Sequence, residues 1–387
     1  MSKTITIGLV GAGWMGKAHA TAFRNAAIIF ASCHPKVRIS IVADIDAESA
    51  RSLAMSIGCD RWTADWQEVV ADPGVDVVDI TTPNNTHFTI SRAAIAAGKH
   101  IYCEKPLTLS AKESAILVKE AQAAGIVTLV GFNYLMNPAQ ALAMDLIQSG
   151  EIGDIISFRG IRDMDNQVSP AAPFNWRHDR KIAGSGALGD TGTHALSMAQ
   201  MLVGDVDAVF GTTKTFIKER PVSVAGSGYN STADYTRTRA VENDDMALCM
   251  LSFANGAIGS MSCSRVATGR RSWLYYEIQG TKGSLCFTQQ LMNELQLYRR
   301  SDPKRERGYK TIRVGPYHGR YGAFYEKPGM QLGYNDLKVI EAHEFLTAVE
   351  LNRPAFPDFR FAHKISQIVD AVEISAAERR WVSLGEV

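Results

Sequence analysis

The chain has 387 residues, of which 46% are hydrophobic and 21% are charged, and its formal net charge is +1. This composition is typical of a soluble globular protein, and the length favours two domains over one. A net charge near zero gives no overall field that would attract nucleic acid or an anionic membrane, so neither partner is predicted. We interpret the basic stretch at 299–310 as a solvated loop, because it lacks interleaved aromatic residues.

Cysteine usage and the N-terminus indicate where the protein works. The six cysteines lie far apart, without a CxxC pair or a Cys/His cluster, so neither a disulfide framework nor a metal site is predicted. The N-terminal apolar run is too short for a signal peptide. No apolar stretch approaches the roughly 20 residues needed to cross a bilayer. We therefore expect a reduced, cytoplasmic protein.

The first expected strand ends in a glycine-rich motif. Residues 4–10 predict a buried strand, Gly11, Gly13 and Gly16 follow in a GxGxxG pattern, and an amphipathic helix comes next. Gly11 would permit the tight turn, Gly13 the approach of a pyrophosphate, and Gly16 close packing of helix on strand. The phosphates would then lie over the helix N-terminus, which favours anions. This segment predicts dinucleotide binding.

The second expected strand ends at Asp44, an acidic residue that would hydrogen-bond the ribose hydroxyls of the adenosine half. It lies further from the glycine motif than the usual spacing of about 20 residues, which we attribute to an extended connection at 28–36. No arginine stands ready for a 2′-phosphate, and Asp46 adds a second carboxylate, so NAD is favoured over NADP. The alternative is that Asp44 only caps the helix that starts near Ala47.

Strands and helices alternate from there to about residue 133. This alternation predicts a doubly wound parallel sheet, in which ligands bind beyond the carboxyl ends of the strands. We expect strands at 75–83, 99–106 and 126–132 and helices at 84–98 and 110–125, with Asn84 or Asn85 as one N-cap and Ser110 as the other. Thr82-Pro83-Asn84 and Glu104-Lys105-Pro106 both fall at strand ends.

The remainder predicts a second domain with a different pattern. A helix at 139–153 and a strand beginning at 154 are followed by alternating runs at 206–218, 244–267, 273–288 and 294–300, and helices return at 335–350 and 361–380. Short turns separate consecutive runs, as in a meander. We expect an α+β domain with a large, mostly antiparallel open sheet and helices on one face.

One segment of the second domain is unusual. Small residues crowd positions 183–192, and a helix is expected to start near Asp190. Asp190 and His194 are four residues apart and would share one helix face. The positive end of the helix dipole disfavours imidazolium, which would leave His194 neutral, as a general base must be. The alternative is that Asp190 is an N-cap and His194 a packed polar residue.

With the glycine loop, "TPNNTHF" (82–88), "EKP" (104–106) and "GDTGTH" (189–194) in place, the chain resembles the glucose–fructose oxidoreductase / inositol dehydrogenase / rhizopine-catabolism (Gfo/Idh/MocA) family. The resemblance covers nearly the whole chain. Within the family, the chain looks most like inositol and levoglucosan-type sugar dehydrogenases. It implies a Rossmann domain at 1–133 and a substrate and oligomerisation domain at 134–387. It also implies homodimers or homotetramers built through the second-domain sheet.

Carried over by position, the resemblance implies three catalytic residues. Lys105 would stabilise the developing alkoxide or share the proton transfer, His194 would act as general base, and Asp190 would orient a substrate hydroxyl or Lys105. Glu104 is expected to offset the charge of Lys105 from behind. The implied cofactor residues are Gly11, Gly13, Trp14, Met15, Gly16, Asp44, Ile45, Thr82, Pro83, Asn84, His87, Glu104, Lys105, Trp176 and Arg177. The implied substrate residues are Lys105, Tyr134, Asp163, Arg177, Asp190 and His194, and no metal is expected.

The substrate is expected to be neutral and rich in hydroxyls. Leu135 and Met136 stand where many similar proteins have an arginine, which argues against an anionic substrate. The presumed mouth carries polar residues that suit a sugar or polyol, or else form a solvated loop: Asp163, Asp165, Asn166, Gln167, Arg177 and His178. We predict NAD-dependent oxidation of a ring secondary hydroxyl of a sugar, anhydrosugar or inositol. Two alternatives are an NAD-dependent glycosidase acting by transient oxidation and a non-catalytic NAD(P)-binding regulator.

Overall fold

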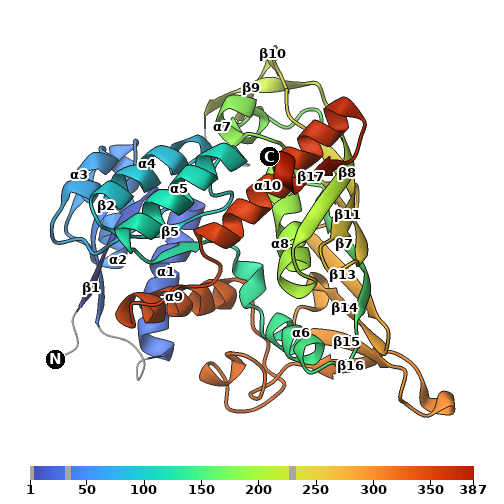
Figure 1. Cartoon of the computed structure of the whole chain (residues 1–387). Coiled ribbons are helices and arrows are strands. Elements are labelled where there is room, and N and C mark those ends of the chain that lie inside the picture. The colour runs from blue at the N-terminus through green and yellow to red at the C-terminus, as the bar shows by residue number, and fades with distance from the viewer. Residues whose placement is uncertain (1–3, 31–35, 226–231) are drawn as a thin grey trace. The chain divides into compact units, whose positions relative to one another are not determined.

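The structure is a computed structural model that describes residues 4–30, 36–225 and 232–387 (Figure 1). Its contacts divide the chain into two compact units, Met1–Met136 with Leu332–Lys364, and Asn137–Gln331 with Ile365–Val387. The chain first passes between the units close to the expected division at 133/134. It then returns to the first unit at 332–364, a segment that the sequence prediction placed in the second domain.

The first unit contains a six-stranded parallel sheet in the order β3-β2-β1-β4-β5-β6, which confirms the predicted doubly wound fold. The order reverses between β1 and β4, and ligands bind at such a switch point. Neither β3 nor the short helix at 66–71 that follows it was predicted. The strands are β1 (Ile5–Val10), β2 (Val37–Ala43), β3 (Trp62–Thr63), β4 (Val77–Ile80), β5 (His100–Cys103) and β6 (Thr128–Val130).

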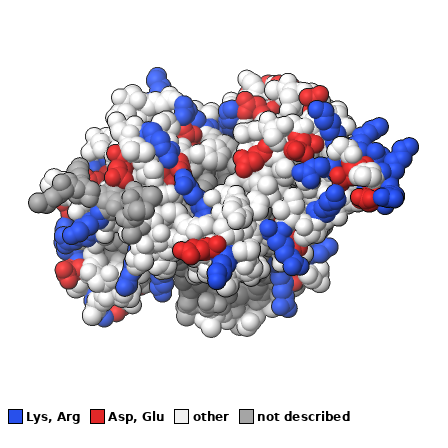
Figure 2. All heavy atoms as spheres, turned by 90° about the horizontal axis from the view of Figure 1, so that it is seen from below, with Lys and Arg blue, Asp and Glu red and all other residues white. Residues whose placement is uncertain are grey.

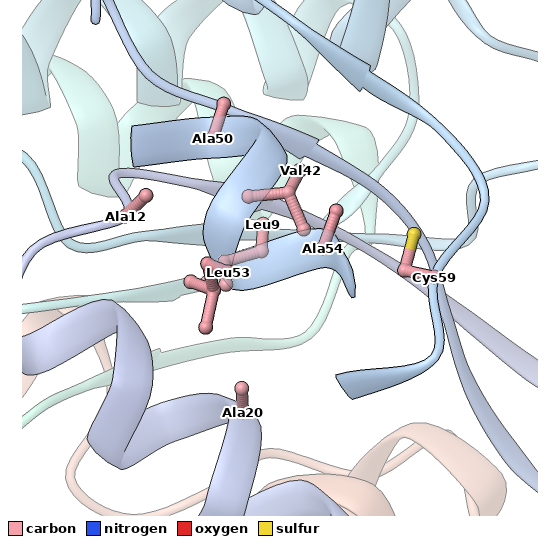
Figure 3. Close-up of a cluster of buried hydrophobic side chains, with 8 residues drawn as sticks. All are labelled: Leu9, Ala12, Ala20, Val42, Ala50, Leu53, Ala54 and Cys59. Atoms are coloured by element: carbon pink, nitrogen blue, oxygen red, sulfur yellow. The ribbon is translucent and has the colours of Figure 1, made fainter. Parts of the chain in front are cut away.

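Helices cover both faces of this sheet, α4 and α5 on one face and α1 and α9 on the other (Figure 1). Figure 3 shows a buried apolar cluster between β1, β2, α1 and α2, with Leu9, Val42 and Leu53 among its members. Ser110 caps α5, as predicted. The helices are α1 (Trp14–Ile29), α2 (Ala47–Ile57), α3 (Trp66–Ala71), α4 (Asn84–Ala96), α5 (Ala111–Ala124) and α9 (Tyr334–Glu350).

The second unit contains a nine-stranded sheet in the order β16-β15-β14-β13-β7-β12-β11-β8-β17, antiparallel except where β7 meets β12. The predicted open, mostly antiparallel sheet is confirmed. A separate two-stranded sheet of β9 and β10 was not predicted. The strands are β7 (Ile155–Asp163), β8 (Val206–Lys214), β9 (Glu219–Ala225), β10 (Thr232–Ala240), β11 (Met246–Phe253), β12 (Ile258–Ser264), β13 (Trp273–Gly280), β14 (Gly283–Thr288), β15 (Glu294–Arg299), β16 (Lys310–Arg313) and β17 (Val382–Ser383).

Helices of the second unit gather on one face of the nine-stranded sheet (Figure 1). They are α6 (Pro138–Gln148), α7 (Arg180–Ala183), α8 (Thr193–Leu202) and α10 (Phe359–Glu378), the last of which crosses the division at 364/365. Among the described residues no helix covers the opposite face, where Leu248, Met250 and Ile258 are exposed.

Basic and acidic side chains are interspersed on the face shown in Figure 2. The basic stretch at 299–310 contains its own ion pairs, Lys310 with Asp302 at 2.8 Å and Arg305 with Glu306 at 3.1 Å. Of the helices in the described ranges, none is long and apolar enough to cross a membrane. Cys33 and most of the predicted connection at 28–36 lie outside the described residues.

Candidate active site

The glycine loop joins β1 to α1 in the first unit. Gly11 has a φ of +105°, and a Cβ there would lie 2.7 Å from the Thr81 hydroxyl oxygen. A Cβ at Gly16 would come within 1.9 Å of the Gly11 carbonyl oxygen, whereas nothing lies within 4 Å of the Cβ position of Gly13. In the described structure no side chain caps the N-terminus of α1. The open space and the unused N–H groups of the first helical turn fit the pyrophosphate of a dinucleotide.

Asp44 follows β2 and contacts the glycine loop directly. Its Oδ2 accepts the Ala12 N–H at 2.7 Å, and its Oδ1 accepts the Asp46 N–H at 3.0 Å. Asp46, and not Asp44, caps α2 by accepting the Ser49 N–H. The alternative that Asp44 is only a helix cap is therefore wrong. The next residue, Ile45, is 95% exposed, which leaves space for an adenosine beside the carboxylate.

The loop after β4 carries the next predicted cofactor residues. The Thr82 hydroxyl oxygen lies 2.6 Å from that of Thr86. Pro83 immediately precedes α4, and Asn84 is the first residue of that helix and is buried. The prediction that Asn84 or Asn85 caps α4 is wrong, since Pro83 occupies the N-cap position without a side-chain hydrogen bond.

His87 is fully buried and lies between two strand ends. Its Nδ1 is 2.8 Å from the carbonyl oxygen of Pro106, and its Nε2 is 2.9 Å from that of Thr82. Burial lowers the pKa of His87, and a neutral ring donates through only one nitrogen. His87 thus braces the loop after β4 against the loop after β5, and its contact with the cofactor stays a prediction.

Lys105 lies just beyond β5 and is half-buried, and its peptide bond to Pro106 is cis. The Glu104 carboxylate, predicted to offset the Lys105 charge, has two other cationic partners. Its Oε1 pairs with Lys338 and lies 3.0 Å from Nε2 of His19, while its Oε2 accepts the backbone N–H of Lys105 at 3.1 Å. Burial alone would raise the pKa of Glu104, but Lys338 and His19 outweigh it and hold that pKa well below its ordinary value.

Three aromatic rings lie next to the glycine loop. Trp14, which begins α1 and is 67% exposed, stacks on Tyr334 with ring centroids 5.6 Å apart. Tyr134 meets the Tyr334 ring edge-on at 5.8 Å, and the Tyr334 hydroxyl is 3.9 Å from Sδ of Met15. The structure thus brings the predicted cofactor residues Trp14 and Met15 close to the predicted substrate residue Tyr134. Sequence reasoning missed Tyr334, the ring between them.

In the second unit, Asp190 and His194 lie on one continuous helical segment. Leu188–Gly192 forms a π-helical turn that runs directly into α8, and His194 is the second residue of α8. The helical segment begins at Leu188, two residues before Asp190, which confirms the predicted start near Asp190. The alternative that Asp190 is the N-cap is wrong, because Ala187 occupies that position. Because the helix dipole acts mainly within the first turn, it does not account for a neutral His194 as expected.

Asp244 anchors the start of this segment. Its buried carboxylate accepts the N–H groups of Gly186 at 2.6 Å and Leu188 at 2.8 Å. A Cβ at Gly186 would come within 1.9 Å of the Asp244 carbonyl oxygen. The small residues before Asp190 therefore permit close packing against the residue that holds the turn in place.

Trp176 and Arg177 lie beside this turn. The Arg177 guanidinium lies over the Trp176 ring, 4.3 Å from its centroid, and Nε of Arg177 is 3.7 Å from Oδ2 of Asp190. The Arg177 carbonyl accepts a hydrogen bond from Nδ2 of Asn243 at 2.8 Å. Three predicted site residues thus form one polar cluster in the second unit, with His194 about one helical turn from Asp190.

Comparison with known proteins shows which family domains the chain matches. Residues 5–132 match the oxidoreductase family with an NAD-binding Rossmann fold, and residues 141–286 match the GFO/IDH/MocA C-terminal domain. Levoglucosan dehydrogenase of Pseudarthrobacter phenanthrenivorans is 38% identical over 387 residues, which is 100% of this chain and 99% of that protein. This chain belongs to the Gfo/Idh/MocA family.

Other members give the same picture. A solved levoglucosan dehydrogenase in complex with NADH and levoglucosan has a TM-score of 0.93 and 38% identity, covering 99% of this chain and 100% of that one. The scyllo-inositol 2-dehydrogenase (NAD(+)) of Bacillus subtilis is 30% identical over 74% of each protein. The family predicted from the motifs is confirmed, and the chain is an oxidoreductase whose first unit is an NAD-binding Rossmann domain.

Asp163, which the family resemblance assigned to substrate binding, lies on the face of the nine-stranded sheet opposite to α8. Asp163 ends β7, and strand alternation puts it on the opposite sheet face from the buried Arg162. α8 packs on the Arg162 face, where Cβ of Ala195 is 3.6 Å from the Cβ position of Gly160. Asp163 therefore does not share the sheet face on which His194 lies.

His178 and Gln167 are buried, and so belong neither to a polar mouth nor to a solvated loop. Nε2 of His178 donates to Oε1 of Gln167 at 3.0 Å, and burial lowers the pKa of His178 to about 3. The fully buried Arg220 donates to the carbonyl oxygens of Gln167 and Ser169. These contacts tether the loop that leads to Trp176.

Sequence reasoning missed the residues whose partners are distant in the chain. One signal was available, because a charged residue inside an apolar run, such as Asp79 in β4, is rarely buried without a partner. The missed residues are His19, Asp79, Tyr102, Arg220, Asp244, Tyr334, Lys338 and Glu341.

Proposed function

We propose that the protein is an NAD-dependent dehydrogenase that oxidises a ring secondary hydroxyl of a neutral sugar, anhydrosugar or inositol to a ketone. The observation that carries the proposal is the 38% identity, over the full length, to a levoglucosan dehydrogenase. An anhydrosugar is accordingly the first candidate substrate. An inositol is the second, because the similarity to scyllo-inositol 2-dehydrogenase covers 74% of the chain.

The proposed chemistry assigns one role to each of three side chains. His194 removes the hydroxyl proton as general base while a hydride leaves the carbon that bears this hydroxyl. NAD, when bound, supplies the hydride acceptor. Lys105 as an ammonium donates to the hydroxyl oxygen and stabilises the alkoxide charge that develops there. Asp190 accepts a hydrogen bond from a neighbouring hydroxyl and so orients the ring. Loss of one hydride and one proton leaves the ketone.

Two features of the second unit and one of the first support a neutral polyol. Asp190 and Arg177 lie close together, with side chains 30% and 26% exposed, and offer an acceptor and donors to hydroxyl groups, which can use both. Leu135 is buried and apolar where an arginine would favour an anion.

The test is the absorbance of reduced nicotinamide, with purified protein and NAD or NADP, against levoglucosan, inositols, aldoses and glucosides. We expect turnover with NAD and one ring polyol. Lys105→Ala should lower turnover by about 10²- to 10⁴-fold and leave calorimetric NAD binding in place, whereas Lys112→Ala, on the exposed side of α5, should behave as wild type. Wild-type protein that binds NAD but turns over nothing in the panel would contradict the proposal.

We also propose that the protein forms homo-oligomers through the uncovered face of the nine-stranded sheet. Leu248, Met250 and Ile258 are 44%, 47% and 65% exposed there, on the adjacent strands β11 and β12. Exposed apolar groups gathered on one surface mark interaction sites. Light scattering after size exclusion should give a dimer or tetramer for the wild type and smaller species for Met250→Lys. A monomeric wild type would contradict the proposal.

A further inference from the structure

Six ionisable side chains form a buried cluster next to the Lys105 backbone in the first unit, and the proposed chemistry uses none of them. They come from α1, β4, β5, the residue after β5, and α9. Each is at least nine-tenths buried. The members of this Glu104 cluster are His19, Asp79, Tyr102, Glu104, Lys338 and Glu341.

Lys338 connects α9 to the strand-end loop. Its Nζ donates to Oε1 of Glu104, and to Oε2 of Glu341 at 2.9 Å. The Tyr102 hydroxyl donates to the same oxygen of Glu341. The Tyr102 ring also faces the Lys338 ammonium, 5.6 Å from its centroid. Lys338 is therefore held from several sides and has little freedom to move away from Glu104.

Glu104 transmits this arrangement to the Lys105 backbone. His19 lies between Glu104, 3.0 Å from its Oε1, and Asp79, 2.8 Å from its Oδ1. The other oxygen of Glu104, Oε2, accepts the Lys105 N–H at 3.1 Å. A Cβ at Gly131 would lie 2.6 Å from Oε1 of Glu104, so the backbone packs directly against the carboxylate. One carboxylate thus joins the buried cations to the backbone of Lys105.

The cluster sets three carboxyl groups against two cations. Burial would lower the pKa of His19, but the charge of Asp79 raises it to about 9, so the ring is protonated near neutral pH. Burial would also lower the pKa of Lys338, yet Glu104 and Glu341 raise it above its ordinary value. Burial raises the pKa of Asp79 and of Glu341. Two positive charges therefore keep Glu104 ionised.

Stability alone does not explain such a cluster. A buried ion pair often contributes no more to folding than apolar side chains of similar volume, because desolvation offsets the Coulomb attraction. Lys338 lies 234 positions from Glu104 in the sequence and nevertheless pairs with the carboxylate that holds the Lys105 N–H. That placement fits a role in setting the geometry of the site.

We propose that Lys338 is a positioning residue for the dehydrogenation, because it fixes the Glu104 carboxylate and thereby the backbone from which the Lys105 side chain extends. The inference rests on the proposed role of Lys105. Lys338 acts through Glu104 and not on the substrate. A displacement of about 1 Å at a reacting group can lower a rate by about 100-fold.

The experiment compares Lys338→Met with Lys99→Met. Lys99 is a matched control, a buried lysine of the same unit whose Nζ donates to the carbonyl oxygens of Asp72 at 2.8 Å and Val75 at 2.6 Å. Lys338→Met should lower kcat about 10- to 100-fold and leave the Kd for NAD little changed. Lys99→Met should lower the thermal midpoint and leave kcat close to that of the wild type.

The pH profile of kcat separates positioning from a merely structural role. Without Lys338, Glu104 loses one of the two cations that lower its pKa, so that pKa rises and kcat of the variant should fall with decreasing pH in a range where wild-type Glu104 stays ionised. The titratable groups that face Glu104 or its loop are His19, Asp79, His87, Tyr102, Cys103, Lys105, Tyr334, Lys338 and Glu341.

Lys338→Gln keeps an N–H donor without the charge, and it replaces Lys338→Met if the latter fails to fold. The same acid-side loss of kcat is expected. A folded Lys338 variant with wild-type kcat and pH profile would overturn the inference, as would an equal loss in Lys99→Met. Either of these outcomes would leave the proposed function intact, provided that the wild-type protein turns over and Lys105→Ala does not. A wild type without turnover would overturn both.

Discussion

The two units hold the backbone around their proposed catalytic side chains in different ways. In the first unit, the backbone N–H of Lys105 donates a hydrogen bond to the buried carboxylate of Glu104, whose charge is balanced by two buried cations. In the second unit, the turn that carries Asp190 is held by Asp244, whose carboxylate oxygens accept backbone N–H groups. The first arrangement depends on charge balance among side chains, and the second on hydrogen bonds to the backbone.

This difference leads us to expect different sensitivities. A charge-balanced cluster responds to pH and to removal of a single charge, since each protonation state shifts the pKa of its neighbours. A carboxylate bonded to the backbone responds mainly to loss of the acceptor, which leaves buried N–H groups unsatisfied. The predictions below test each arrangement in turn.

The largest expected effect joins the two units. If Lys105 and His194 act on the same hydroxyl, each single alanine variant should lower kcat by about 10²- to 10⁴-fold. The double variant should be little worse than the poorer single variant, because groups that work as a unit are strongly non-additive. Steady-state kinetics of the three variants, with calorimetric NAD binding as control, would show this. Losses that multiply would separate the two roles.

Asp244→Ala tests the backbone-bonded arrangement. Two buried N–H groups lose their acceptor, at about 1–3 kcal/mol each, so we expect the free energy of unfolding to fall by about 3 kcal/mol. Denaturant unfolding measures the change. Asp207→Ala, at an exposed position of β8, is the control and should stay within about 0.5 kcal/mol of the wild type. Equal changes in both variants would remove Asp244 as the anchor.

Much of the first unit could be predicted from the sequence because its elements and its proposed cofactor and catalytic residues follow local patterns. The glycine motif stands between a buried strand and an amphipathic helix, and Asp44 immediately follows the next strand. Lys105 follows the end of β5, at the sheet edge where ligands bind. Each of these positions follows from the period and order of the elements alone.

The rest depended on partners that no local pattern reveals. Lys338 reads as one more polar residue of a helix, and its pairing with Glu104 emerges only when α9 returns to the first unit. The π-helical turn before α8 has a small-residue sequence that equally suits a loop, and its anchor Asp244 stands 58 positions from Gly186. Long-range packing decided both.

His19 tests the charge-balanced arrangement. The charge of Asp79 raises the pKa of His19 from 6.5 to about 9. The contribution of His19 to the free energy of unfolding is therefore fully present below pH 6.5 and is lost as the pH rises through 9. The full shift corresponds to at most about 3 kcal/mol. The free energy of unfolding should therefore fall between these pH values in the wild type, and less so in His19→Gln. Parallel pH curves from urea unfolding would contradict this.

The smallest effect comes from Asp44, a backbone-bonded carboxylate in the first unit. It accepts the N–H groups of Ala12 and Asp46, as Asp244 accepts two N–H groups, but it is only half-buried, so its loss should cost little stability. The cost should appear in binding. Asp44→Ala should weaken NAD about 10-fold and NADP less, because a 2′-phosphate no longer meets the carboxylate.

Calorimetry with both nucleotides measures the ratio of the two affinities, and Asp46→Ala is the matched control. Asp46 is adjacent and also acidic, but its carboxylate caps α2, so its removal should loosen the helix and change the ratio less than the removal of Asp44 does. An equal change of ratio in both variants would assign the preference to the loop as a whole. An unchanged ratio in Asp44→Ala would remove its carboxylate from the ribose site, and leave it a backbone anchor of the same kind as Asp244.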